Sequence, residues 1–342
     1  MSTFAIGVDL GGTSLRIAAV DSAGTLLEKV TTGTKVALGR DHVITEMCDA
    51  IRATAQKFGR VGTLDGIGIG VPGIIDMETG MLRESPNLPG WHDYPVREEI
   101  ERRLKTQVIL ENDANAAAFG EKWLGAAQSV GSMCMLTLGT GVGGGIVLDG
   151  KVWHGMKGMA GELGHMNVQL EGPPCGCGSR GCLEQLASAT AVKRMAIEAI
   201  ASEKAPELGR AMKEDPEFSA KVVYQMAVQG DQPAQEIFAK VGRALGIVVA
   251  DLVNIFNLPM YVIGGGVASA WEAFSPSMME EVERRSFVYR ATAPKPNLSV
   301  GAKKTLVTRA LLGSDAGLYG TARLPMVATT AEAVPAGSRR RA

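Results

Sequence analysis

The sequence has almost no net charge, no long hydrophobic run and few cysteines, and each of these features excludes a class of protein. Of its 342 residues, 35 are Lys or Arg and 36 are Asp or Glu, so the formal net charge is -1. A sequence with so little net charge is not expected to form the broad basic surface of a protein that binds nucleic acid or a membrane. Because no apolar run reaches about 18 residues, we expect no transmembrane helix.

The N-terminus and the cysteines also argue against secretion. Met1 is not followed by a basic stretch and an apolar core, so no signal peptide is predicted. The chain has five cysteines, and three of them lie between Cys175 and Cys182. We therefore expect a cytoplasmic protein with reduced thiols.

Glycine is abundant, with 43 residues, and most of it falls in clusters, which indicates backbone that lines a ligand. No G-x-x-x-x-G-K-[ST] occurs, and Gly11-Gly12 lies between two strand-like runs instead of before a helix. The backbone N–H groups of such a hairpin can still bind an anion, and Asp9 beside it could hold Mg²⁺ through water. The alternative is an ordinary hairpin turn with a solvated aspartate.

The order of the expected elements indicates two α/β lobes. Residues 4–110 follow the pattern β-β-β-α-β-α-β, which is typical of a three-layer α/β lobe. A strand, a Gly139-Thr140-Gly141 turn and a second strand then recur, so each lobe begins with a glycine hairpin that can face a phosphate. We predict a small lobe at 1–112 that is completed by a helix at 314–325, a large lobe at 113–313, and a disordered tail at 326–342.

Asp113 lies between a short apolar strand and a helix. Ligands bind open α/β sheets at the carboxyl ends of strands, and a carboxylate there is a candidate base for a substrate hydroxyl. The alternative is that Asp113 only caps the helix, which would contribute about 1 kcal/mol. A single cap does not explain why Glu111 and Asn112 precede it, and this favours a functional site.

The stretch at 161–186 carries the most specific pattern in the chain. His165, Cys175, Cys177 and Cys182 can satisfy a tetrahedral Cys₃His zinc site, although independent thiols are the alternative. Because the protein fills all four positions, the zinc would be structural and would hold the loop in place. Three residues before His165 lies Glu162, and two after Cys182 lies Glu184. Their carboxylates could accept hydrogen bonds from the vicinal hydroxyls of a polyol, or they could be solvated loop acids.

Taken together, these stretches resemble the ROK family of sugar kinases, repressors and open reading frames. The resemblance covers nearly the whole chain except the tail. It implies an α/β, two-lobed actin-like ATPase (ribonuclease H-like) fold with an interlobe cleft and a structural zinc loop. The matching motifs are DLGGTSLR (9–16), ENDAN (111–115), LGTGVGGGIVLDGKVWHG (138–155), GELGH (161–165) and CGCGSRGCLE (175–184).

The resemblance also implies a role for each matching residue. Asp113 would accept the proton of the sugar's 6-hydroxyl, and His165 would place one ring nitrogen on zinc and its opposite edge near the sugar. The other implied sugar ligands and pocket residues are Gly73, Asn87, Asn112, Glu162 and Glu184. The implied phosphate and Mg²⁺ loops are Asp9, Gly11, Gly12 and Thr13, with Thr140 and Gly141. The implied adenosine contacts are Gly265 and Gly266, for which a tight strand–helix turn is the alternative.

The activity that the resemblance implies is an ATP-dependent hexokinase, with glucose as the first substrate to expect. An N-acylhexosamine kinase, acting on N-acetylmannosamine or N-acetylglucosamine, is the alternative enzyme, because the same acids would serve both. A sugar-responsive repressor is disfavoured, since the first strand begins near Phe4 and leaves no room for a preceding helix-turn-helix domain. The implied cofactors are ATP, Mg²⁺ and structural Zn²⁺. A hexose is the implied partner, with a homodimer expected and neither nucleic acid nor a membrane.

Overall fold

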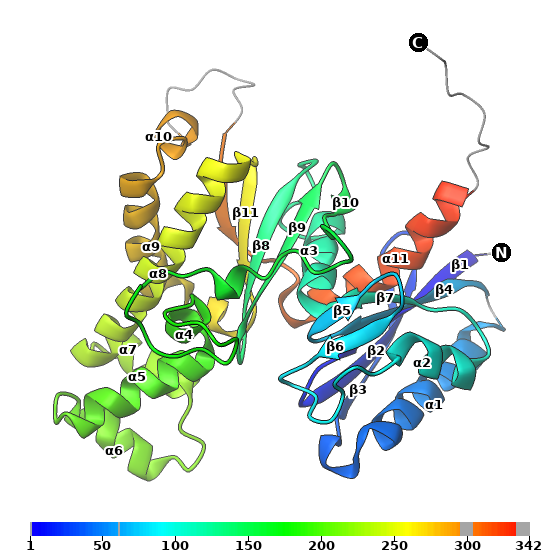
Figure 1. Cartoon of the computed structure of the whole chain (residues 1–342), viewed down its shortest axis with the longest axis horizontal. Helices are drawn as coiled ribbons and strands as arrows, with labels where there is room; N and C mark the ends of the chain where they lie inside the picture. The colour runs from blue at the N-terminus through cyan, green and yellow to red at the C-terminus, as the bar shows by residue number, and fades with distance from the viewer. Residues whose placement is uncertain (1, 61, 295–303, 333–342) are drawn as a thin grey trace. The chain divides into compact units, whose positions relative to one another are not determined.

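The computed structural model describes residues 2–60, 62–294 and 304–332, and the chain divides into two compact units (Figure 1). Unit 1 comprises residues 1–128, 151–160 and 315–342, and unit 2 comprises residues 129–150 and 161–314. The first unit thus continues past the boundary that we predicted at residue 112. The domain limits of the sequence analysis stay a prediction.

Unit 1 is built around a mixed sheet of β1 (Ser2–Leu10), β2 (Ser14–Asp21), β3 (Leu26–Gly33), β4 (Gly62–Val71) and β7 (Ile109–Asn112). The strands follow the order β3-β2-β1-β4-β7. β2 is antiparallel to β1 and β3, whereas β4 is parallel to β1 and β7. The helices of this unit are α1 (Arg40–Phe58), α2 (Val96–Leu104), α3 (Asp113–Trp123) and α11 (Ala316–Glu332).

The alternation of side chains along β1 joins two helical layers to this sheet. Phe4, Ile6 and Val8 share a buried cluster with residues of α1 and α2. The intervening Ala5 packs with Leu318 and others of α11. The result is the three-layer α/β arrangement that the sequence predicted.

A hairpin of β5 (Ile74–Asp76) and β6 (Met81–Glu84) is an addition to the β-β-β-α-β-α-β order that we predicted for residues 4–110. The buried Asp76 carboxylate organises its turn, because Oδ1 accepts from the backbone N–H groups of Glu78 and Thr79 at 3.2 Å each. Arg83 donates to the other oxygen at 3.2 Å. Such a turn depends on a side chain and leaves little periodicity for a sequence pattern to reveal.

Helix α11 is longer than we predicted. We expected a helix at 314–325 and a disordered tail at 326–342, because the tail is rich in Ala, Thr, Pro and Arg. The helix instead includes Pro325 and continues to Glu332. Met326 is buried beside Ala5 and Val20, and this packing stabilises the helix beyond the proline. The rest of the predicted tail, 333–342, lies outside the described residues.

The sheet of unit 2 contains β8 (Met133–Leu138), β9 (Val142–Leu148), β11 (Met260–Gly264) and β12 (Leu306–Arg309). Its strands follow the order β9-β8-β11-β12. The short strand β10 (Lys151–Val152) comes after β9 in the chain, and its residues group with unit 1. β11 is parallel to both of its neighbours, and β9 is antiparallel to β8. The helices are α4 (Glu184–Ala187), α5 (Ala189–Ala201), α6 (Pro206–Glu214), α7 (Ala220–Val228), α8 (Gln232–Phe256), α9 (Trp271–Arg285) and α10 (Tyr289–Thr292).

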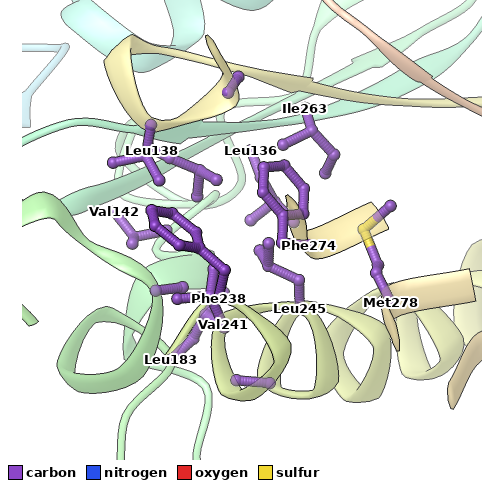
Figure 2. Close-up of a cluster of buried hydrophobic side chains, with 14 of the residues drawn as sticks. Leu136, Leu138, Val142, Leu183, Phe238, Val241, Leu245, Ile263, Phe274 and Met278 are labelled. Atoms are coloured by element: carbon purple, nitrogen blue, oxygen red, sulfur yellow. The ribbon is translucent and has the colours of Figure 1, made fainter. Parts of the chain in front are cut away.

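Helix α8 passes through the core of unit 2. Figure 2 shows Phe238, Val241 and Leu245 of α8 among the buried side chains of the sheet and of α9. Gly242 and Gly246 allow the close approach of α9, because a Cβ at either position would collide with the α9 backbone or side chains. Core packing thus accounts for the apolar pattern of α8. None of the helices in the described part of the chain is both long and apolar enough to cross a membrane.

The contact between the unit 1 sheet and α11 gives a first testable prediction. A Cβ on Gly68 of β4 would collide with the backbone carbonyl of Thr321. We expect Gly68→Ala to lower the free energy of unfolding by about 2 kcal/mol, as overpacking does in tight interiors. Urea denaturation measures this, with Gly33→Ala as the control, because a Cβ there meets its nearest atom at 3.9 Å. Equal stability of the two variants would contradict the packing argument.

Candidate active site and metal centre

The strand register brings two predicted site segments to one edge of the unit 1 sheet. Asp9 of β1 is paired with Gly70 of β4, and Gly70 is paired with Glu111 of β7. Because neighbouring strands lie about 4.8 Å apart, the backbones of Asp9 and Glu111 are about 10 Å apart. The first glycine turn and the turn that carries Asp113 therefore leave the sheet at the same edge.

Asn112, and not Asp113, is the N-cap of α3. Its Oδ1 accepts from the backbone N–H groups of Ala114 and Asn115 at 2.9 and 3.1 Å. Its Nδ2 donates to the carbonyl of Gly73 at 3.1 Å. Asp113 lies one position further, in the first turn of the helix, partly exposed, with Oδ1 accepting from Ala114 N at 2.9 Å. Because Asn112 caps the helix, helix capping does not explain why an aspartate stands at position 113.

Two further predicted residues of unit 1 border these turns. Gly73 has a φ of +117°, and a Cβ there would collide with the Glu84 carbonyl, so the fold itself requires glycine. The carbonyl of Asn87 lies 2.7 Å from where a Cβ of Gly12 would stand. The segment with Asn87 is thus packed against the first glycine turn.

Asp9 is a buried carboxylate beside that turn. It is only 9% exposed, and Arg16 Nη2 lies 2.9 Å from its Oδ2. Burial raises the pKa of Asp9; the Arg16 charge opposes this, and Asp315 adds to it. Gly11 N donates to Ser14 O at 2.9 Å and closes the turn. A carboxylate next to such backbone is the kind of ligand that a hydrated Mg²⁺ accepts in proteins.

A buried ion pair, which the sequence analysis missed, supports the Asp113 turn. Glu111 is 1% exposed, and its Oε2 lies 2.7 Å from Nε2 of His154. Its Oε1 accepts from Asn112 N at 2.9 Å and from Asn115 Nδ2 at 3.1 Å. The hydrogen bond with Glu111 raises the pKa of His154, and partial burial opposes the rise. A glutamate at the end of a buried strand signals that a partner is needed, but the sequence does not say which residue supplies it.

In unit 2 the second glycine turn is fixed by residues that follow the cysteine loop. Glu184, the first residue of α4, accepts from Val142 N at 3.0 Å through Oε2. A Cβ on Gly141 would collide with this carboxylate, so a larger residue there would displace the Glu184 side chain. Thr190 Oγ1 donates to the carbonyl of Thr140 at 2.8 Å. The turn and Glu184 therefore form one structural element, which the sequence spacing did not predict.

The glycines after β11 have different surroundings. Gly265 has a φ of +83°, and a Cβ there would lie 2.5 Å from the Leu138 carbonyl oxygen of β8. Strand packing and backbone conformation thus explain Gly265, as the tight-turn alternative proposed. A Cβ on Gly266 would meet no atom within 4 Å. Gly266 is therefore the position of the two with open space beside its backbone.

The three cysteines and His165 converge in unit 2. Their ligand atoms all lie within 4.8 Å of one another. Cys177 and Cys182 have their Sγ atoms 3.7 Å apart, and Cys175 Sγ lies 3.6 Å from His165 Nδ1. Tetrahedral zinc with Zn–S bonds near 2.3 Å places sulfur atoms about 3.8 Å apart, so the cluster has the right size for such a metal ion.

Backbone contacts link the segments that carry these side chains. Cys175 N donates to Ser179 O at 2.9 Å and closes the tip of the loop. Cys182 forms an isolated bridge with Asn167, which follows His165 closely in the chain. Burial raises the pKa of the Cys182 thiol, whereas hydrogen bonding to the Ser179 backbone lowers that of Cys177. A metal ion would therefore displace a proton from at least the buried thiol.

His165 has one ring edge toward the cluster and the other toward a carboxylate. Its Nδ1 faces Cys175, while its Nε2 lies 3.9 Å from Glu162 Oε2. Partial burial raises the pKa of Glu162; His165 opposes this shift, and the charge of Glu184 adds to it. Glu162 and Glu184 are thus close enough to repel each other, which is the arrangement of a paired acceptor site.

The predicted site residues accordingly form one group in each unit, and their individual roles stay predictions. The group in unit 1 comprises Asp9, Gly11, Gly12, Thr13, Gly73, Asn87, Asn112 and Asp113. The group in unit 2 comprises Thr140, Gly141, Glu162, His165, Cys175, Cys177, Cys182, Glu184, Gly265 and Gly266.

The fold and these groups match one family of proteins. The model of the ROK family matches residues 5–326, and the chain belongs to this family. Its structural neighbours are ROK kinases with an actin-like ATPase fold, and the chain shares that fold. The fold class and the family resemblance of the sequence analysis are confirmed.

Relatives named as glucokinases match most of this chain. The glucokinase of Halalkalibacterium halodurans is 37% identical over 317 residues, which cover 92% of each chain. The glucokinase of Thermotoga maritima is 41% identical over 277 residues, which cover 81% of this chain and 86% of that protein. The crystal structure of a ROK family glucokinase from Streptomyces griseus, in complex with glucose and AMPPNP, is 31% identical. It superposes with a TM-score of 0.74 over 94% of this chain and 98% of that one.

The ion pair of Glu111 and His154 predicts a measurable titration. The raised pKa means that the charged pair stabilises unit 1 below the usual histidine value of about 6.5, and that this contribution is lost as pH rises through the folded pKa. We expect NMR titration to find the His154 pKa above that value and Glu111→Gln to lower it. The chain has four histidines, so single substitutions can assign the signals. An unchanged His154 pKa in Glu111→Gln would show that the pair does not form.

Proposed function

We propose that this chain is an ATP-dependent hexose kinase that phosphorylates the 6-hydroxyl of glucose. Relatives at 37% and 41% identity are named glucokinases, and the related Streptomyces griseus structure contains glucose and AMPPNP. The structural observation that carries the proposal is the position of Asp113. It follows the cap of α3 at the sheet edge that also holds Asp9, where a base and a phosphate loop are needed together.

Asp113 is the proposed general base. Phosphoryl transfer needs little covalent help from the protein, but it needs an attacking oxygen in line with the phosphate and compensation of negative charge. A carboxylate held in the first turn of α3 can orient the 6-hydroxyl and accept its proton. The Asn112 cap and its bond to the Gly73 carbonyl fix the backbone on which this carboxylate depends.

The sugar's other hydroxyls are proposed to bind paired acceptors and donors. Glu162 and Glu184 each supply carboxylate oxygens, and the Nε2 edge of His165 faces the first of them. Vicinal hydroxyls suit such a set, because each can donate to a carboxylate and accept from a neighbouring N–H. The residues proposed to complete the sugar site are Gly73, Asn87 and Asn112.

The two glycine turns are proposed to bind the nucleotide phosphates. Thr13 and Thr140 are exposed at their tips, where backbone N–H groups and hydroxyls can donate to phosphate oxygens. Mg²⁺ would be held through Asp9 and would neutralise phosphate charge when bound. Gly11, Gly12 and Gly141 allow close approach at the turns, and Gly265 and Gly266 are proposed to border adenosine.

The Cys₃His cluster is proposed to hold a structural zinc ion. His165, Cys175, Cys177 and Cys182 would fill all four positions, which leaves no open site for Lewis-acid chemistry. The metal would fix the segment between Glu162 and Glu184, and through Glu184 it would support the second glycine turn.

A substrate panel tests the proposed activity. Purified protein is assayed for ADP release with ATP, Mg²⁺ and glucose, N-acetylglucosamine, N-acetylmannosamine or no sugar. We expect the highest kcat/KM with glucose. Preference for an N-acetyl sugar would support the alternative kinase, and ADP release that no sugar stimulates would overturn both.

The base assignment predicts a large kinetic effect. We expect Asp113→Asn to lower kcat by about 10²-fold or more, the size of a lost general base, with little change in sugar binding. Steady-state kinetics and glucose titration by calorimetry measure the two quantities. Asp41→Asn, at an exposed position of α1 in the same unit, is the control and should keep its activity. Full activity of Asp113→Asn would remove that residue from the role.

The metal proposal predicts that zinc and sugar affinity are lost together. Cys177→Ala should contain no stoichiometric zinc by elemental analysis and should have a raised KM for glucose, because the loop of Glu162 and Glu184 loses its anchor. Cys134→Ala, which removes a buried thiol of β8 outside the cluster, should keep both. A zinc-free Cys177→Ala protein with normal KM would disconnect the metal from the sugar site.

A further inference from the structure

The segment that follows β10 contributes a histidine to the support of the Asp113 turn. His154 Nε2 lies 2.7 Å from Glu111 Oε2, and the other oxygen of Glu111 accepts from Asn112 N and Asn115 Nδ2. Glu111 is 1% exposed, so its charge has little access to water. A carboxylate in that position needs its hydrogen bonds, and the bond with the His154 ring is charge-assisted, and so stronger than the others, whenever the ring is protonated.

This ion pair is one of several contacts that support the turn that carries Asp113. Asn112 Nδ2 donates to Gly73 O at 3.1 Å, just before the β5–β6 hairpin. Met77, at the end of β5, donates its N–H to Lys157 O at 3.0 Å. The same segment carries His154, whose ring contacts the Glu111 carboxylate. The turn that carries Asp113 is thus held both from the hairpin and from residues 154–160, all within unit 1.

The segment itself has a defined conformation. Ala160 N donates to His154 O at 3.1 Å, and Gly155 and Gly158 have φ values of +62° and +93°. A Cβ on Gly158 would collide with the side chain of Met77. The histidine therefore belongs to a loop whose conformation is defined by backbone bonds and packing, although its side chain is 37% exposed.

We propose that His154 is a positioning residue for phosphoryl transfer: through Glu111 it fixes the backbone at Asn112 and so the direction of the Asp113 carboxylate. The inference rests on the proposed function, because it needs Asp113 to act as the base. His154 itself touches neither sugar nor nucleotide in this scheme. Misplacement of a reacting group by about 1 Å can cost 10²-fold in rate, so loss of this support should lower kcat.

The test separates positioning from plain stability. His154→Phe removes the donor and leaves the Glu111 charge buried without it, so both kcat and Tm should fall. In the double variant Glu111→Gln with His154→Phe the buried charge is also removed, while the amide oxygen can still accept from Asn112 N and Asn115 Nδ2. We expect the double variant to recover Tm and to keep a kcat at least about 10-fold below wild type, with KM for glucose within about threefold.

A conservative variant and a matched control complete the experiment. His154→Gln keeps a donor that can reach Glu111 and should recover most of the kcat of wild type. His42→Gln removes another half-exposed histidine that pairs with a glutamate, Glu46 at 3.4 Å on α1, and should change neither kcat nor Tm appreciably.

Each result decides for or against the inference. It is overturned if His154→Phe keeps wild-type kcat, if kcat recovers together with Tm in the double variant, or if the whole effect lies in KM. If His154→Phe does not fold, the double variant and His154→Gln still give the comparison. A wild-type protein that phosphorylates no hexose overturns the proposed function and this inference together, whereas an active wild type with an equally active His154→Phe overturns the inference alone.

Discussion

The structure of unit 1 depends on one polar constraint, the charge of Glu111 buried at the end of β7. A carboxylate that is 1% exposed must make its hydrogen bonds inside the protein, and it makes them to His154, Asn115 and the backbone of Asn112. These bonds determine where β7 stops and where α3 begins. The side chain of Asn112 is then available as the cap, and Asp113 enters the first turn of the helix. The position of the candidate base follows from a buried charge two residues before it.

Close packing by small residues places this turn within the layers. α3 and α11 approach each other so closely that a Cβ on Gly120 or Gly320 would collide with the facing backbone. On the sheet, a Cβ on Gly7 or Gly68 would likewise collide with the backbone of α11, which therefore lies directly against β1 and β4. This contact explains why residues after 112 remain with unit 1. The glycines of these strands are thus needed for packing, and only some of the clustered glycines are candidates for ligand contact.

Much of the fold could be predicted from periodicity, and most of what was missed depends on particular side chains. The β-β-β-α-β-α-β order and the two glycine hairpins follow from apolar alternation interrupted by glycine, and both are present. The β5–β6 hairpin was missed because its turn is organised by the Asp76 carboxylate, a local bond without periodicity. The end of α11 was placed too early because tertiary packing of Met326 outweighs the effect of Pro325.

The candidate site was predictable where ligand chemistry is encoded by spacing, as in the Cys₃His cluster, whose members do converge. The site was not predictable where two residues that are far apart in the sequence form a single contact. His154 and Glu111 are 43 positions apart, and Glu184 reaches Val142 N over 42 positions. Neither pairing repeats along the chain, so no pattern reports it. Gly265 is a case in which the structure adds a reason that the sequence left open. From the sequence alone this glycine could be a ligand contact, and the structure shows that its positive φ and the nearby Leu138 carbonyl already explain it.

The two groups of site residues are therefore stabilised by different physical means. In unit 1 the supports are a buried ion pair and a capped helix on a packed sheet, and such supports respond to protonation. In unit 2 the segment with Glu162, His165 and the cysteines contains short 3₁₀ and bridge elements and many glycines, with only a small share of the unit's apolar core. A metal ion with four protein ligands would supply the rigidity that such a segment cannot obtain from hydrophobic burial. Glu184 would transmit that rigidity to the second glycine turn through Val142 N, so under the proposed function a phosphate-binding loop would depend on a cluster of thiols that has no part in the chemistry.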